Sequence, residues 1–144
     1  MKTLSITTAL IAICIALVWF SPSCRAIRSF DNFERNARKV ITGPELAAWG
    51  TKLLALYPTN ATPKLADLGT NFPPQLLKLA PQIGPHIFVY EAEGTNTPGW
   101  VLVFWGSGFL GHCGFEIGPT NFAGTRAQHN QWCPGVYSWN DRGH

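Results

Sequence analysis

The sequence predicts an α+β fold, with two N-terminal helices packed on a small antiparallel β-meander of three or four strands. Three observations predict it. Apolar residues recur at three- and four-residue spacing between positions 27 and 57, which is typical of amphipathic helices. Runs of β-branched and aromatic residues follow position 86, as expected for strands. Glycine- and proline-containing turns separate these runs, which favours antiparallel pairing after the helices.

An apolar run without a charge, Leu4–Phe20, precedes this domain. As a helix it would extend roughly 25 Å, the short limit for a membrane span. The run predicts a signal peptide or signal anchor over residues 1–26 and a single small α+β domain over residues 27–144. Three fates stay open: cleavage after Ala26, lipid attachment at Cys24 as in a bacterial lipoprotein, or retention as a transmembrane helix.

Each of these fates predicts an exported protein, which is membrane-anchored, periplasmic or extracellular. The membrane is therefore an expected partner, through the apolar segment. The formal net charge is +3, and 13% of the residues are charged. Because basic and aromatic residues do not interleave in the predicted sheet, and export removes such a partner, we expect no nucleic-acid binding.

The first helix is predicted between positions 27 and 41, with an Asp31-x-x-Glu34 capping pattern near its start. The second is expected to begin at Pro44, a residue suited to the first helical position, and to stop at Pro58. Residues 59–71 are expected to form a loop. One or two helical turns are expected over residues 73–79.

Strands are predicted at Ile87–Ala92, Trp100–Trp105, His112–Ile117 and Val136–Trp139. Glycines between the second and third predict a hairpin in which Trp105 pairs with His112. This register predicts one apolar face made of Trp100, Leu102, Phe104, Cys113, Phe115 and Ile117. The opposite face would carry Val101, Val103, Trp105, His112 and Glu116.

The second of these faces is the candidate binding surface, with Trp105, His112 and Glu116 as its binding residues. Trp105 together with Trp132 or Trp139 would form an aromatic platform for sugar rings or a protein partner. The alternative is that most tryptophans are core residues of a small domain. We therefore expect a non-enzymatic binding module whose partner is an envelope glycan or a protein.

The segment Gly111–Gly118, GHCGFEIG, resembles the histidine-bearing strand of the NlpC/P60 and CHAP cysteine peptidases, which cut cell-wall peptides. The resemblance implies that His112 generates the thiolate of an upstream cysteine. The upstream cysteines lie in or beside the leader. Cys113 itself is expected to point to the opposite face from His112. A cell-envelope hydrolase that uses cysteine and histidine is thus the alternative function, with His112, Glu116 and Cys113 as catalytic candidates and a Cys113–His129 pair left open.

The order of elements over residues 44–118 also resembles small exported bacterial proteins of no established function. The resemblance rests on the proline-started helix, the Pro73-Pro74 turn and the hairpin with its Trp-Gly-x-Gly-Phe motif. It implies no activity.

Cys113 and Cys133 are the thiols that remain once a leader is removed. In an oxidising compartment they are expected to form a disulfide, which would close a loop of about 20 residues and stabilise the fold by about 3 kcal/mol. Two reduced cysteines are the alternative. With His112 and His129 they are also metal-ligand types, but neighbouring strand residues diverge. We therefore expect no metal and no cofactor.

Overall fold

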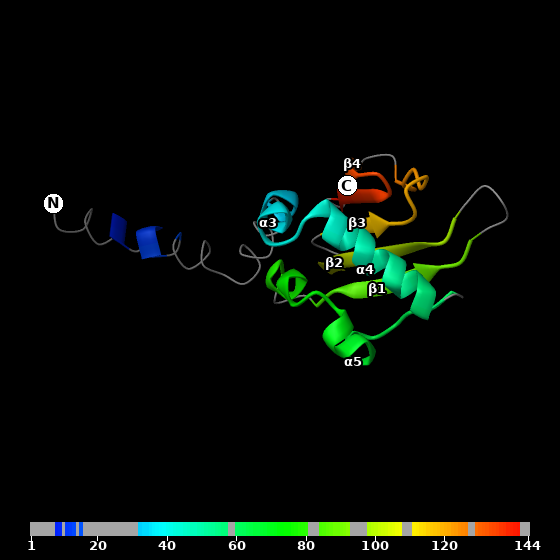
Figure 1. The fold of residues 1–144 in the computed structure, drawn as a ribbon. Helices are drawn as coiled ribbons and strands as arrows, with labels where there is room; N and C mark the ends of the chain where they lie inside the picture. Colours follow the sequence, from blue (N-terminus) through cyan, green and yellow to red (C-terminus); the bar gives the residue numbers. More distant parts are fainter. Residues whose placement is uncertain are drawn as a thin grey trace.

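The computed structural model describes residues 8–9, 11–13, 15, 32–57, 60–80, 84–92, 98–107, 111–126 and 129–141. They form an α+β fold in which helices lie against one face of an antiparallel sheet (Figure 1). The helical elements are α3 (Phe33–Val40), α4 (Gly43–Leu56), α5 (Leu65–Leu68), η1 (Gly69–Asn71) and η2 (Pro74–Lys78). The strands are β1 (His86–Tyr90), β2 (Trp100–Ser107), β3 (Gly111–Ile117), β4 (Asn130–Cys133) and β5 (Val136–Asp141).

Most of the predicted leader lies outside the described residues. Residues 8–9, 11–13 and 15 are helical, and Ile11, Ile13 and Ile15 are exposed. Within the described part of the chain, no helix is both long enough and apolar enough to cross a membrane.

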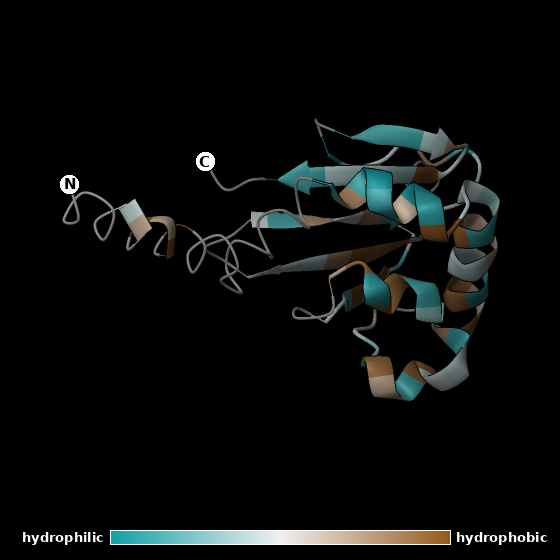
Figure 2. Cartoon of the chain, turned by 90° about the vertical axis from the view of Figure 1, so that its left-hand side faces the viewer, coloured by the Kyte–Doolittle hydropathy of each residue, from teal (hydrophilic) through white to brown (hydrophobic). Residues whose placement is uncertain are grey.

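The two predicted N-terminal helices are present as α3 and α4. The start predicted for the first helix, residues 27–31, lies outside the described residues. Helix α4 begins with a capping box, because the Thr42 side chain accepts from the Glu45 amide and Glu45 Oε2 accepts from the Thr42 amide at 2.7 Å. The Thr42 hydroxyl also donates to Glu45 Oε2, at 2.8 Å. The bond from the Thr42 amide, and after it the bond from the hydroxyl, lower the pKa of the Glu45 carboxyl. Apolar and polar residues alternate around the turns of the helices (Figure 2).

The sheet has five strands in the order β1-β2-β3-β5-β4, so the predicted meander of three or four strands is incomplete. The turn after β4, with Gly135 at φ +81°, folds β5 back between β3 and β4. The strand β4 was missed because its polar Asn130 and Gln131 carry no apolar alternation. The outer edge of β1 is protected by Ala61, which forms a bridge to Val89.

The predicted hairpin register is wrong by one residue. Trp105 pairs with Cys113, and His112 pairs with Gly106. A one-residue shift exchanges the two faces of a strand. Glycine permits this register, since a Cβ at Gly114 would lie 2.1 Å from the Val103 carbonyl oxygen.

The core lies between the helices and the sheet face that the corrected register creates. Trp105, predicted on the open face, has an exposed fraction of 0% and its ring contacts Phe33 of α3. The core residues contributed by the central strands are Val101, Val103, Trp105, Cys113, Phe115, Ile117 and Val136.

Candidate functional site

The sheet face opposite the helices carries a row of aromatic rings. Neighbouring rings lie 4.2 to 6.4 Å apart between centroids and are tilted by 12 to 26° from one another. In order along the row they are His86, Phe104, Phe88, Tyr90, Trp100 and Phe122. All but Phe122 are exposed or half-buried, so the row offers apolar contact surface to a ligand.

A hollow of about 270 Å³ opens on this face, and we call it the aromatic cleft. Strands β1 and β2 contribute its apolar wall, and β3, β5 and the segment after β3 contribute the polar and aromatic side facing it. Its lining residues are Phe88, Tyr90, Leu102, Phe104, His112, Arg126 and Trp139. An apolar hollow with a few convergent polar groups is the usual form of a small-molecule site.

A buried carboxylate holds the polar side of the cleft. Glu116 has an exposed fraction of 0%, and its Oε2 accepts from the Thr125 amide at 2.8 Å. Its Oε1 accepts from the Thr125 hydroxyl and lies 3.5 Å from Arg126 Nε, an ion-pair contact too long for a good hydrogen bond. The Arg126 guanidinium carbon lies 3.6 Å from the centroid of the Trp139 ring. Glu116 therefore positions Arg126 over Trp139, at the cleft.

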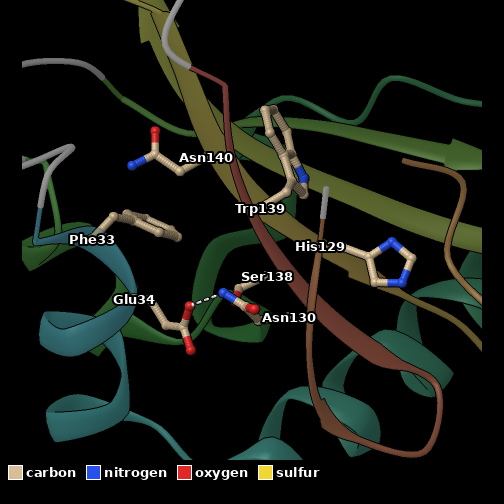
Figure 3. A pocket seen from close by; sticks show the side chains of 7 residues that line it. All are labelled: Phe33, Glu34, His129, Asn130, Ser138, Trp139 and Asn140. Atoms are coloured by element: carbon tan, nitrogen blue, oxygen red, sulfur yellow. Dashed lines mark hydrogen bonds between the residues drawn. The ribbon is translucent and has the colours of Figure 1, made fainter. Parts of the chain in front are cut away.

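A second hollow, the polar cavity, lies beside the N-terminal end of β4 and measures about 370 Å³. Figure 3 shows side chains from α3, β4 and β5 around it. Asn130 Nδ2 donates to Glu34 Oε2 at 2.7 Å across it. Its lining residues are Phe33, Glu34, His129, Asn130, Ser138, Trp139 and Asn140. Trp139 is thus shared by the cavity and the cleft.

The three predicted binding residues occupy different places. His112 lines the aromatic cleft, half-buried, with its ring edge-on to Phe104. Glu116 lies on the same face but is covered, and acts through Arg126. Trp105 is in the core, because the register shift turns it toward the helices. Its place on the open face is taken by Phe104.

Several cleft residues were missed from the sequence. In β1, buried Ile87 and Val89 alternate with half-buried Phe88 and Tyr90, and this alternation is a local signal that both rings lie on the open face. Arg126 has no local signal, because its segment has no periodicity and only the fold brings it to Trp139.

The predicted Cys113–Cys133 disulfide is not formed, and both residues are free thiols. Strand β5 aligns Cys113 with Asn140 and Cys133 with Val136. Four residues of strand span roughly 13 Å, whereas a disulfide needs Cα atoms within about 7 Å. The two cysteines are therefore held too far apart to pair.

The sequence's catalytic candidates are not assembled into a nucleophilic pair. Cys113 has an exposed fraction of 0%, and burial raises the pKa of its thiol far above the ordinary value, which disfavours the reactive thiolate. Cys113 lies on the helix side of the sheet and His112 on the other. His129 packs on Tyr137, which pairs with Glu116 on that same open face, so it does not meet Cys113 either.

Among the described residues, no three histidine, cysteine, aspartate or glutamate side chains lie close enough to hold a metal ion. His129 is held by its Nδ1, which contacts the carbonyl oxygen of Arg126. Because a carbonyl oxygen only accepts, Nδ1 carries the proton and donates it. This leaves His129 beside the polar cavity as a hydrogen-bonding group.

In comparisons with protein-family models, curated proteins and solved structures, the chain matches none.

Proposed function

We propose that this protein is a non-enzymatic binding module whose aromatic cleft takes one ring of an envelope glycan. The observation that carries the proposal is the row of partly exposed rings that borders a hollow with His112 and Arg126 at its polar side. A sugar ring has apolar C–H faces and a hydroxyl edge. The cleft offers both complements, apolar rings and polar donors.

The size of the cleft supports a single ring as the bound unit. Small-molecule sites generally span ~300–1,000 Å³, and the cleft measures about 270 Å³. The Arg126 guanidinium has five N–H donors in a rigid fork. Within the described residues only the Glu116 carboxylate pairs with it, so its remaining donors are available to ligand oxygens.

The proposed location of the protein follows from the Leu4–Phe20 run. We propose that residues 1–26 direct export or anchor the chain in the membrane, with the domain of residues 27–144 on the periplasmic or extracellular side. This location would bring the cleft to the glycans of the envelope.

The hydrolase alternative has less support. The buried Cys113 thiol has a raised pKa, and it lies on the opposite sheet face from His112.

The proposal is tested by calorimetric titration of the full chain with chitotriose and cellotriose, two soluble neutral oligosaccharides. We expect at least one to bind, and Phe88→Ala or Phe104→Ala to weaken that binding by roughly tenfold, about 1.4 kcal/mol. Leu77→Ala, an exposed apolar residue outside the cleft (40% exposed), is the matched control and should bind as the unaltered chain does. Absence of binding, or an equal loss in the control, would contradict the proposal.

A further inference from the structure

The polar cavity and the aromatic cleft share one wall residue, Trp139. The cavity lies along the edge of β5, beyond the N-terminal end of β4. Asn130, the first residue of β4, pairs with Ser138, and residues Trp139 to Asp141 of β5 extend beyond this pair. A ligand that lies in the cleft can therefore continue past Trp139 around this edge and into the cavity.

Trp139 carries a polar atom that lacks a partner. Its exposed fraction is 4%, and its Nε1–H has no acceptor within the described part of the chain. Burying an unpaired donor is costly, so a ligand oxygen that displaces the atoms covering this N–H and accepts from it gains affinity. The indoles of Trp49 and Trp105 are also unpaired, but of the three only Trp139 lines the cleft or the cavity.

The other groups around the cavity suit hydroxyls. Asn130 and Asn140 have amides that both donate and accept, the Glu34 carboxylate accepts, and the side chains of Glu34 and Asn130 converge near Ser138 (Figure 3). Sugar hydroxyls both donate and accept, so they match this mixture. Because the seven lining residues include a carboxylate and no lysine or arginine, the cavity favours a neutral unit over an anionic one.

We propose that the polar cavity is a second subsite, which takes a neutral sugar unit of the same glycan whose neighbouring ring occupies the aromatic cleft. The inference rests on the proposed function and extends it: the protein recognises an oligosaccharide of at least two units. Each hollow is close to the lower size limit of a small-molecule site, and the two together fall well within the usual range.

The test compares N-acetylglucosamine with its β-1,4-linked dimer and trimer, titrated into the full chain and followed by NMR chemical shifts. We expect the dimer or trimer to bind roughly tenfold more tightly than the monomer. Trp139→Phe removes the N–H and keeps a ring in the shared wall, and Asn130→Ala removes an amide from the cavity. Each should abolish the gain with length. Asn130→Ala should also leave monomer binding unchanged, because Asn130 lines the cavity and not the cleft.

Asn121→Ala, an exposed asparagine away from both hollows, is the matched control and should keep the gain. Asn130→Ala keeps the test decisive even if Trp139→Phe fails to fold. Equal affinities for monomer, dimer and trimer, all weakened by Phe88→Ala, would overturn the second subsite and leave the proposed function standing. Failure of the monomer, dimer and trimer alike to bind would overturn the second subsite, and absence of cellotriose binding as well would overturn the proposed function.

Discussion

A single residue, Glu116, fastens the segment that follows β3 to the open face of the sheet. Its carboxylate has no exposed surface, and burying a carboxylate is unfavourable unless it is paired and hydrogen-bonded. The amide and hydroxyl of Thr125 and the guanidinium of Arg126 supply those partners. Glu116 thus acts as a structural residue that decides where Arg126 lies.

Replacing Glu116 by alanine is expected to lower the free energy of unfolding by about 2–3 kcal/mol, because the Thr125 donors and Arg126 lose their charged acceptor. Glu116→Gln keeps the volume and one acceptor oxygen, so its loss should be smaller. Urea denaturation measures both. Glu91→Ala, at an exposed carboxylate, is the control and should stay within about 0.5 kcal/mol of the unaltered chain. A Glu116→Ala chain as stable as this control would contradict the assignment.

At the scale of elements, helix α4 approaches the sheet at a glycine. A Cβ at Gly50 would lie 2.3 Å from Cγ2 of Ile117 in β3, closer than atoms in contact can be. Glycine inside a helix costs about 1 kcal/mol relative to alanine. The cost is offset by the close packing of α4 on β3 that the missing side chain allows.

We therefore expect Gly50→Ala to destabilise the protein by about 1–3 kcal/mol through overpacking, despite the higher helix propensity of alanine. Ile117→Ala removes the clashing methyl, so the double variant should be more stable than the sum of the two single losses predicts. Chemical denaturation of the four chains gives the coupling. Strict additivity, or a stabilising Gly50→Ala, would show that α4 does not depend on this contact.

At the scale of the whole molecule, the strand order separates the two thiols of the domain. Cys113 is buried in the core and Cys133 is half-buried on the outer strand. Burial raises the pKa of both thiols, that of Cys113 far more. A raised thiol pKa leaves less thiolate at neutral pH, and so slower alkylation.

Iodoacetamide is accordingly expected to label Cys133 in the folded protein and Cys113 only after unfolding. Intact mass with and without prior reduction checks this, and tryptic peptides assign the labelled residue. A Cys133→Ser chain should take up no label in the domain until denaturant is added. If label uptake requires prior reduction, the two cysteines form a disulfide, and this result would contradict the strand order.

The sequence by itself determined the α+β class, the two helices and the strands β2 and β3, because helix caps, apolar spacing and β-branched runs act over a few neighbouring residues. It also placed His112 and Glu116 on one face, since alternation along a single strand is local. Only the tertiary structure decided that Trp105 is in the core, that β5 lies between β3 and β4, and that Arg126 reaches Trp139. The hairpin register depends on which face the helices cover, and a slip of one residue leaves every local pattern unchanged. The cleft depends on contacts between residues distant in the chain, which no local pattern encodes.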